Sequence, residues 1–380
     1  MSDGAIALAL NSGSSSLKFG VYRAAGARLQ LLFGGDADLA GARKGCLHVR
    51  DADGRTVMNA RGQTDPTEAI EAVAGLLTAY RLPSPAAIGH RFVHGGPELT
   101  RHAVIDAAVA RRLKAAAVFA PLHVPPALAI LEAARVQFPG IPHVACLDTA
   151  FHAGLPEIAR TLPLPADIRA AGVRRYGFHG LSCESIVDQL GEDLPGRLIV
   201  AHLGSGASIT AIRAGRSVDT SMGLTPTGGV IMATRPGDLD PGVLVYLLRE
   251  CKLDAAGLEE LLDHHSGLAG ISGIGGDMRV LHEAAPSNAD ARLAIEMFCY
   301  SVRRQVAAMI AALNGVDALV FTGGIGENDA VLRSNICAGL SWAGIDPDDP
   351  TARCAVRVLA TREEERIAHH SLALTAGSLP

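Results

Sequence analysis

The chain has 380 residues, of which 48% are apolar, 4% aromatic and 19% charged. This length suits about two domains, and the mean hydropathy of +0.24 indicates well-packed cores. The net charge of -5 and the pI near 6.3, with no basic block, exclude nucleic acid as the main partner.

The sequence also argues against a membrane protein and a secreted protein. The first residues lack a charged region followed by a long apolar core, so no signal peptide is expected. No apolar run reaches the roughly 20 residues that span a bilayer. The seven cysteines are scattered without a CxxC pair, so neither a disulfide framework nor a zinc site is predicted. We therefore expect a cytoplasmic enzyme with no membrane partner.

A hydroxyl-rich turn follows the first predicted strand. Residues 5–10 are small and apolar, residues 11–18 read NSGSSSLK, and apolar residues resume at Phe19. One interpretation is a solvated loop, since Ser and Gly are common in turns. The other is an anion site, because amides, hydroxyls and one ammonium group suit a phosphate. It is not a P-loop, since the chain continues as a strand rather than a helix.

Strands and helices alternate along the rest of the chain. A β-rich opening extends to about residue 58, with a hairpin signal at Asp53-Gly54. Helices are predicted near 65–80, 106–118, 126–137 and 288–313, and strands at 143–147 and 316–322, the last followed by a loop, GGIGEN, and a further helix. A second strand, Ser/Gly turn and strand at 197–212 repeats the pattern of the opening. This repeat predicts two similar α/β domains with a hinge near 148–152.

The segment VFTGGIGEN at 320–328 reads as a strand, a glycine turn and a helix start. Glycines let a ligand approach the backbone, and a helix N-terminus favours anions. The spacing does not match the GxGxxG dinucleotide fingerprint. Contact with a nucleotide and a simple tight turn are both open here.

Four charged or polar residues stand at informative places. Arg91, in GHRFVHGG, is either a ligand-binding residue or a buried, satisfied arginine. Asp148 directly follows a strand, where ligands gather in α/β proteins, unless it or Thr149 caps a helix. His179 lies in a Gly-bounded loop, and Arg235 lies in a Pro/Gly segment without a regular pattern.

The acidic segment REEERIA at 362–368 is most simply an exposed helix face. The adjacent histidines at 264–265 and at 369–370 do not share a helix face, so they do not predict zinc binding.

Together these segments resemble the acetate and propionate kinase family. The resemblance runs in order through NSGSSSLKFGVY, GHRFVHGG, APLH, LDTAFH, RRYGFHG, HLGSGASI, DTSMGLTP, TRPGDLDPG, SGLAGISG, FTGGIGEN and EEERIA, across essentially the whole chain. It implies an α/β fold of two similar actin-like (ribonuclease H-like) ATPase domains facing a central cleft. The N-terminal domain would comprise residues 1–148 plus about 366–380 on the acyl side, and the C-terminal domain residues 149–365 on the nucleotide side.

The resemblance also implies an activity: reversible, Mg²⁺-dependent transfer of the ATP γ-phosphate to acetate, giving acetyl phosphate and ADP. Mn²⁺ is an alternative ion, and a homodimer is expected. Propionate or another short-chain acid is the alternative substrate. A non-catalytic nucleotide-binding homologue and a pyrophosphate-using relative are further alternatives.

The resemblance assigns roles to individual residues. Arg91 and Arg235 would hold the acyl carboxylate and the phosphoryl group. Asp148 would orient or activate the carboxylate, and His179 would hydrogen-bond the phosphoryl oxygens. The remaining assignments are Asn11 and Glu363 for magnesium; Val93, Leu122, Phe178 and Pro226 for the acyl methyl group; and Ser14, Ser16, Lys18, His202, Leu203, Gly204, Ser205, Gly206, Asp277, Met278, Arg279, Gly324, Ile325, Gly326, Glu327 and Asn328 for the nucleotide.

Several residues depart from the family pattern. Ser205 replaces the Asn of HLGNG, and Val124, Gly228, Pro236 and Arg362 also differ, as does the FHGLSC segment. These positions flank the expected sites without removing a proposed catalytic group. They bear on substrate preference and turnover more than on reaction class.

Overall fold

The computed structural model describes residues 4–13, 16–26, 28–38, 45–61, 65–349 and 351–376. The chain divides into two compact units: unit 1 is Met1–Ala153 with Arg362–Pro380, and unit 2 is Gly154–Thr361. The predicted domain bounds, 148 and about 366, fall within a few residues of these limits. Glu363, expected in the second domain, belongs to unit 1.

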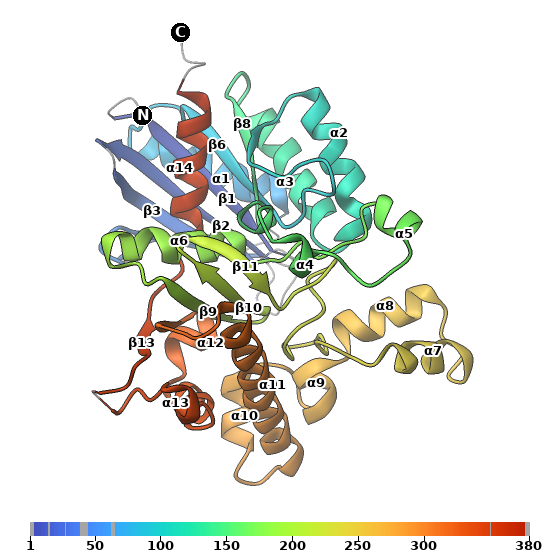
Figure 1. The fold of residues 1–380 in the computed structure, drawn as a ribbon. Helices are drawn as coiled ribbons and strands as arrows, with labels where there is room; N and C mark the ends of the chain where they lie inside the picture. Colours follow the sequence, from blue (N-terminus) through green and yellow to red (C-terminus); the bar gives the residue numbers. More distant parts are fainter. Residues whose placement is uncertain are drawn as a thin grey trace. The chain divides into compact units, whose positions relative to one another are not determined.

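Unit 1 contains an eight-stranded sheet in the order β5-β4-β3-β2-β1-β6-β8-β7 (Figure 1). The strands are β1 (Ile6–Ser12), β2 (Ser16–Ala25), β3 (Arg28–Asp38), β4 (Cys46–Asp51), β5 (Thr56–Arg61), β6 (Ala87–Phe92), β7 (Ala103–Val104) and β8 (His143–Leu147). The first five strands form an antiparallel meander, as the β-rich opening predicted. Strands β1, β6 and β8 are parallel, so their carboxyl ends meet at one edge.

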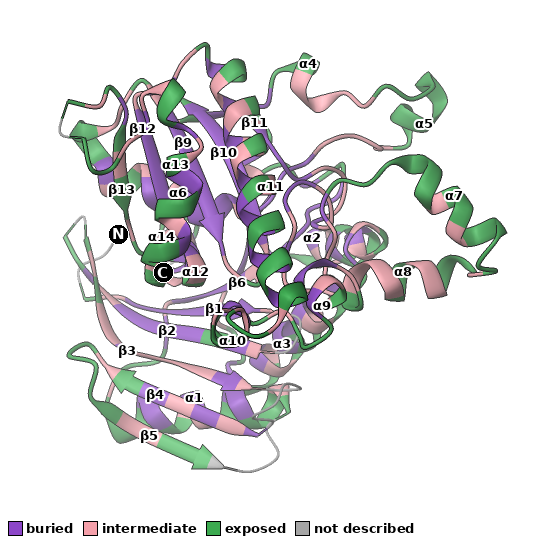
Figure 2. Ribbon diagram, turned by 90° about the horizontal axis from the view of Figure 1, so that it is seen from below, coloured by how far each residue is buried: buried purple, intermediate pink, exposed green. Residues whose placement is uncertain are grey.

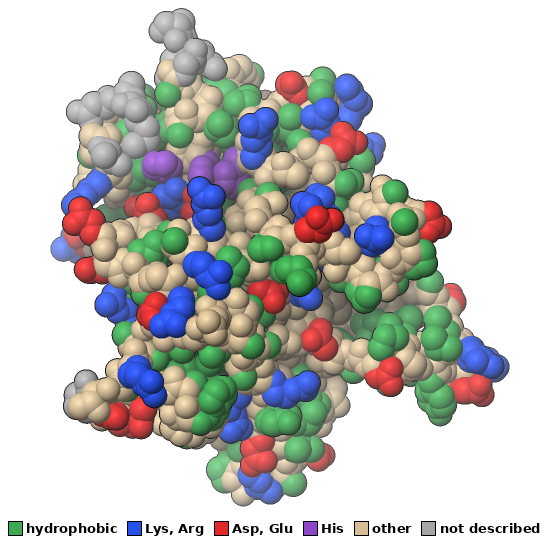
Figure 3. All heavy atoms as spheres, in the orientation of Figure 1, with side chains coloured by type: hydrophobic (Ala, Val, Ile, Leu, Met, Phe, Trp, Pro, Cys, Tyr) green, Lys and Arg blue, Asp and Glu red, His purple; other side chains and the backbone are tan. Residues whose placement is uncertain are grey.

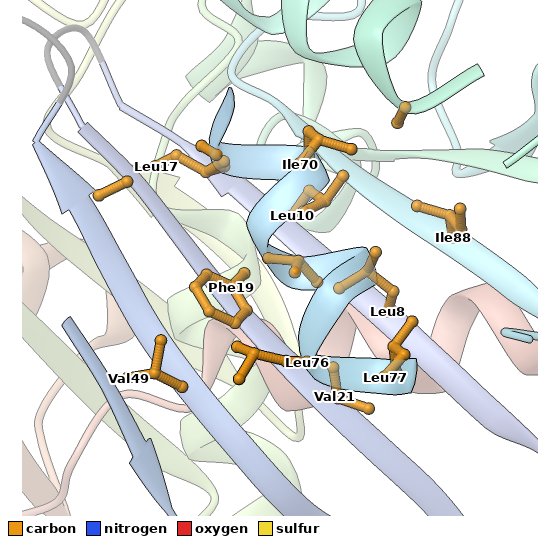
Figure 4. Packing of buried hydrophobic residues seen from close by; sticks show 14 of the residues in the cluster. Leu8, Leu10, Leu17, Phe19, Val21, Val49, Ile70, Leu76, Leu77 and Ile88 are labelled. Atoms are coloured by element: carbon orange, nitrogen blue, oxygen red, sulfur yellow. The ribbon is translucent and has the colours of Figure 1, made fainter. Parts of the chain in front are cut away.

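Helices pack on this sheet: α1 (Pro66–Ala79), α2 (Ala107–Ala115), α3 (Val124–Gln137) and α14 (Glu363–Thr375), with 3-10 turns η1 (Ala116–Phe119) and η2 (Ala150–His152). A capping box starts α1, because the Asp65 carboxylate accepts two backbone N–H groups and the Glu68 side chain returns to Asp65. Buried side chains of β1 and β2, such as Leu8 and Phe19, pack against Ile70 of α1 (Figure 4).

Helix α14 contacts β1, β2, β6 and β8. Its approach requires Gly89 on β6, because a Cβ there would collide with Ser371 and Ile367. The predicted exposed face of REEERIA is wrong for part of this helix: Glu363, Ile367 and Ala368 are buried. The periodicity of a short charged segment did not reveal which side meets the sheet.

Unit 2 contains a five-stranded sheet in the order β11-β10-β9-β12-β13. Its strands are β9 (Arg197–Leu203), β10 (Ala207–Arg213), β11 (Arg216–Thr220), β12 (Ala318–Thr322) and β13 (Ala355–Val358). Strands β9, β10 and β11 form an antiparallel meander, and β9, β12 and β13 are parallel. This order matches β3-β2-β1-β6-β8 of unit 1. The predicted α/β class with two similar units is therefore confirmed.

The helices of unit 2 are α4 (Glu157–Arg160), α5 (Ala166–Ala170), α6 (Gly180–Leu190), α7 (Pro241–Arg249), α8 (Ala255–His264), α9 (Gly267–Ser272), α10 (Met278–Ala284), α11 (Ala289–Leu313), α12 (Gly323–Asn328) and α13 (Ala330–Ala338), with 3-10 turns η3 (Gly191–Asp193) and η4 (Ser341–Ala343). The predicted long helix is α11; Val302, Val306 and Met309 are buried on the face that packs toward β9 and β10. Figure 2 shows these central strands as buried.

The segment GGIGEN was predicted to be a loop, but it forms the helix α12, which begins directly after β12. Gly323 makes this possible, since it adopts φ +79° beside the backbone of Leu203, where a Cβ would collide. Among the described residues, none of the helices combines the length and apolar character needed to cross a membrane.

Candidate active site

Arg91 and Asp148 lie on neighbouring parallel strands in unit 1. Arg91 is on β6, and Asp148 directly follows β8. The Arg91 Nε and Nη2 atoms both donate to Asp148 Oδ2, at 3.0 and 2.6 Å. Asp148 is fully buried. Thr149 occupies the N-cap position of η2, as the alternative expected, but its side chain makes no capping hydrogen bond, and Asp148 pairs with Arg91 instead.

Asn11, at the end of β1, joins this pair to the start of α14. Its Oδ1 accepts from Arg91 Nη1 at 3.0 Å, and its Nδ2 donates to Glu363 Oε2 at 2.9 Å and to Glu364 Oε1 at 2.7 Å. Arg91 Nη1 also lies 3.8 Å from Glu363 Oε2. We call Asn11, Arg91, Asp148, Glu363 and Glu364 the carboxylate cluster. With one guanidinium against three carboxylates, it is negative overall when all are ionised.

Arg91 keeps its charge in this setting. Burial alone would lower the pKa of the guanidinium, but Asp148 and Glu363 outweigh that effect and raise it above its ordinary value. Its side chain is only 15% exposed. Arg91 is thus a partly buried, paired arginine, and also a fixed positive charge at the strand edge where ligands bind in α/β sheets.

Other predicted residues of unit 1 lie nearby in the fold. Ser16 and Lys18 of β2 line a cavity of about 550 Å³ together with Tyr22, Asp36 and Glu364. Val93 is buried directly after β6, and Leu122 is half-buried in the turn before α3. Ser14 lies outside the described residues.

The second hairpin predicted in the chain lies in unit 2, where β9 and β10 are joined by a tight turn. The Gly204 N–H donates to the Gly206 carbonyl at 2.9 Å, and the Ser205 carbonyl accepts from the Ala233 N–H at 3.2 Å. A Cβ at Gly206 would stand 3.0 Å from Arg235 Nη2 and 3.2 Å from His179 Nε2. The missing side chain therefore lets an arginine and a histidine approach this turn.

His179 is held in an unusual conformation beside a second histidine. It has φ 58° at the N-cap of α6, a conformation that costs free energy in a non-glycine residue. Its ring stacks on His202 of β9, with 4.2 Å between centroids and 15° between planes. His179 Nδ1 lies 2.9 Å from Ser208 Oγ. Such enforced geometry is typical of functional sites.

Arg235 lies in the long segment between β11 and α7, which has no regular structure, as predicted. Its Nη1 donates to the carbonyl of Pro226, a predicted acyl-site residue. Burial lowers the pKa of Arg235, and Asp263 partly offsets this. Unlike Arg91, Arg235 forms no ion pair with a described residue. A backbone carbonyl, rather than a carboxylate of the described residues, therefore holds its guanidinium.

The remaining nucleotide-site candidates of unit 2 lie at the start of α10 and on α12. A Cβ at Gly204 would lie 3.9 Å from the Gly324 backbone nitrogen, so the turn lies next to the start of α12. Asp277 caps α10 and pairs with Arg279 at 2.7 Å, both well exposed. Asn328 Nδ2 donates to the Gly324 carbonyl at 2.9 Å, an interaction within α12.

The structure thus brings Asn11, Arg91, Asp148 and Glu363 together in unit 1, and His179, His202, Arg235 and the β9–β10 turn together in unit 2. Sequence reasoning missed Glu364, Ser208 and Ser182. Glu364 stands beside a predicted residue, but nothing local shows that it receives an Asn11 N–H. Ser182 and Ser208 are fully buried hydroxyls whose only signal was proximity in sequence to His179 and His202. The functional roles implied by the resemblance remain predictions.

Comparison with known proteins gives a consistent result. Residues 6–370 match the model of the acetokinase family. An acetate kinase of Nitrobacter hamburgensis is 40% identical, covering 97% of this chain and 95% of its own, and one of Dichelobacter nodosus is 42% identical, covering 90% and 87%. Among solved structures, a propionate kinase from Francisella tularensis has a TM-score of 0.89 at 34% identity, covering 97% of this chain and 100% of its own. The acetate kinase of Porphyromonas gingivalis has a TM-score of 0.84 at 34% identity, covering 97% and 99%. The chain therefore belongs to the acetokinase family.

Proposed function

We propose that this protein transfers the γ-phosphoryl group of ATP to acetate, giving acetyl phosphate and ADP, and catalyses the reverse reaction. The observation that carries the proposal is the acetokinase match over residues 6–370, which includes Arg91, Asp148, His179 and Arg235. The relatives at about 40% identity are named acetate kinases. A rival non-catalytic nucleotide-binding role would require that these four residues serve structure alone.

The chemistry suits these side chains. Acetate is already ionised at neutral pH, so the enzyme need not deprotonate its nucleophile. Phosphoryl transfer then depends on positioning and on stabilising the charge that spreads over the phosphoryl oxygens. Arg235, which has no described carboxylate partner, and His179 beside it would supply that stabilisation. Arg91, held rigid by Asp148 and Asn11, would hold the acyl carboxylate in place.

ATP is the co-substrate, and we propose Mg²⁺ as its ion. Mg²⁺ prefers oxygen ligands and is usually bound through one or two carboxylates together with water and substrate phosphates. The carboxylate cluster offers such oxygens and is negative overall. Glu363 would hold the ion, and Asn11, whose Oδ1 already accepts from Arg91, would orient Glu363. When bound, Mg²⁺ would neutralise phosphate charge.

The test is an assay for ADP release from ATP and Mg²⁺ with acetate, propionate or butyrate, combined with hydroxylamine trapping of acyl phosphate. We expect turnover that depends on both the carboxylate and Mg²⁺. ATP binding by calorimetry without turnover on any of the three acids would favour the non-catalytic role. Pyrophosphate in place of ATP should give no comparable turnover.

Propionate is the second candidate acceptor, because the Francisella tularensis structure with the TM-score of 0.89 is described as a propionate kinase. The ratio of kcat/KM for acetate to that for propionate decides between them.

We also propose a homodimer formed through α7. This helix has no buried residue, and Val243, Val245, Tyr246 and Leu248 are 40%, 50%, 58% and 39% exposed. Figure 3 shows apolar side chains at the surface over α7 and α8. Contiguous apolar surface of this kind marks association sites, and most soluble oligomers are symmetric assemblies of one chain. A cytoplasmic location agrees with the seven cysteines, all described and all free thiols.

A further inference from the structure

Thr361 is the last residue of unit 2, and side chains from two helices form hydrogen bonds with the backbone of Ala360 and Thr361. Its N–H donates to Glu327 Oε1 at 3.0 Å, and the same oxygen accepts the Gly323 N–H at the start of α12, also at 3.0 Å. The preceding carbonyl, of Ala360, accepts from Gln189 of α6 at 3.0 Å. Glu327 was predicted to contact the nucleotide, yet one of its oxygens holds two backbone groups of unit 2.

The Thr361 hydroxyl begins a chain of hydrogen bonds that ends on His202. Thr361 Oγ1 donates to Ser182 Oγ at 3.1 Å, and Ser182 Oγ lies 2.8 Å from His202 Nδ1. Ser182 is fully buried. Because it accepts from Thr361, its own proton finds its acceptor among the described residues in His202 Nδ1. If His202 Nδ1 instead donated its N–H to Ser182 Oγ, the Ser182 proton would be left buried and unpaired, which is costly.

The direction of this chain sets the tautomer of His202. When Nδ1 accepts a hydrogen bond in a neutral imidazole, the proton resides on Nε2. His202 Nε2 faces the β9–β10 turn, since a Cβ at Gly204 would lie 3.8 Å from it. The histidine thus presents an N–H donor to the turn where we propose that the nucleotide phosphates bind.

The stacked partner His179 has the opposite hydrogen-bond arrangement at its Nδ1 atom. Ser208 Oγ donates to the Phe178 carbonyl at 3.3 Å, so it accepts from His179 Nδ1 at 2.9 Å. His179 therefore carries its proton on Nδ1 when neutral. The two rings are similar in type and place, but their serine partners give them different tautomers.

We propose that Thr361 and Ser182 are positioning residues that fix His202 as an Nε2–H donor to the nucleotide phosphates. The inference rests on the proposed function, because it assigns phosphates to this turn. Neither residue would touch the nucleotide. Thr361 acts through Ser182, and Ser182 acts through His202.

The experiment compares Thr361→Val, which removes the hydroxyl but keeps the side-chain shape, with Thr361→Ser, which keeps the hydroxyl donor. Thr375→Val is the matched control, because Thr375 is a buried threonine whose hydroxyl donates to the Ser371 and Leu372 carbonyls of its own helix, α14. The first readout is the ¹⁵N chemical shifts of His202, identified as the signals lost in His202→Gln. The second is the Kd for ADP by calorimetry.

We expect neutral His202 of the wild type to carry its proton on Nε2, and the Thr361→Val variant to show a mixture of tautomers. The Kd for ADP should rise about tenfold in Thr361→Val, the loss expected when a charge-assisted hydrogen bond loses its fixed geometry. Thr361→Ser and Thr375→Val should stay within about twofold of wild type. If Thr361→Val does not fold, Ser182→Ala should show the same two changes.

Three results would overturn the inference: a wild-type His202 with its proton on Nδ1, an unchanged tautomer and Kd in Thr361→Val, or an equal loss in Thr375→Val. A wild-type protein that binds no ADP and turns over no carboxylate would contradict the proposed function instead. The tautomer measurement needs neither nucleotide nor turnover, so the two failures are separable.

Discussion

Asn11 and Glu363 are 352 positions apart in the chain, and Asn11 Nδ2 donates to Glu363 Oε2 at 2.9 Å. The same amide accepts from Arg91. One short side chain thus aligns a carboxylate and a guanidinium that belong to different elements, α14 and β6. If Glu363 holds the ion, its orientation depends on Asn11.

The first prediction concerns this pair. Glu363→Gln should raise the Mg²⁺ concentration needed for half-maximal activity, because one of the carboxylates that suit Mg²⁺ is lost. Glu365→Gln, a change to a neighbouring glutamate of the same helix outside the carboxylate cluster, is the control. Titration of activity with Mg²⁺ at saturating ATP and acetate measures the effect. An equal shift in both variants would show that Glu363 has no special part in ion binding.

Replacing either arginine should slow the reaction. Arg91→Ala and Arg235→Ala should each lower kcat by about 10²-fold or more, since removing a preorganised charge typically costs about 3 kcal/mol of transition-state stabilisation. Arg91→Ala also leaves Asp148 without its ion-pair partner, so thermal unfolding must be measured beside the kinetics. An Arg91→Ala protein that unfolds earlier but keeps its kcat would assign Arg91 to structure alone.

The size of the acyl group should depend on Val93. One methylene in an apolar pocket is worth about 1–3 kcal/mol of discrimination, so propionate should be a poorer substrate without being excluded. Val93→Ala should shift kcat/KM toward propionate and butyrate. The measurement is the acetate-to-propionate ratio of kcat/KM in both proteins. An unchanged ratio would mean that Val93 does not face the acyl chain.

A buried histidine pair should make the protein sensitive to acid. His90 Nε2 of β6 lies 2.8 Å from His143 Nδ1 of β8. Burial, with Arg135 nearby, lowers the pKa of His143 from 6.5 to about 4, and burial with His143 and Arg135 lowers that of His90 well below its ordinary value. The unfolded chain therefore binds more protons below about pH 6.5. The contribution of the neutral pair to the free energy of unfolding is present above that pH and is lost as the pH falls toward 4.

Urea unfolding between pH 4 and 7 tests this, using a His90→Leu/His143→Leu double variant to remove both titrating groups. The free energy of unfolding of the double variant should fall less steeply with acid than that of the wild type. Identical slopes would place the acid sensitivity elsewhere in the chain.

The apolar surface of α7 should hold the dimer together. Tyr246→Glu introduces a charge into that surface and should shift the protein toward monomer, because an unpaired charge is costly to bury in an interface. Lys252→Glu, just beyond α7, changes charge outside the apolar surface and is the control. Sedimentation measures both. A wild-type monomer, or a Tyr246→Glu dimer of unchanged affinity, would contradict the proposed interface.

The sequence by itself determined the repeated strand, turn and strand pattern, the long helix α11 and the family. Strand and helix periodicities are local, and eleven segments in a fixed order require no knowledge of contacts. The arginines, Asp148 and His179 were singled out from the sequence as candidates because they stand near a glycine, a proline or the end of a strand, and their roles remain predictions.

Only the tertiary structure decided how these residues are arranged. The parallel pairing of β1, β6 and β8 places Asn11, Arg91 and Asp148 at one edge, and the packing of α14 on those strands buries Glu363 while Arg362 stays exposed. Likewise, the opposite tautomers of His179 and His202 follow from Ser208 and from Thr361 acting through Ser182. Hydrogen-bond partners far apart in the chain leave no periodic trace in the sequence, because burial and strand register select them only once the sheets have formed.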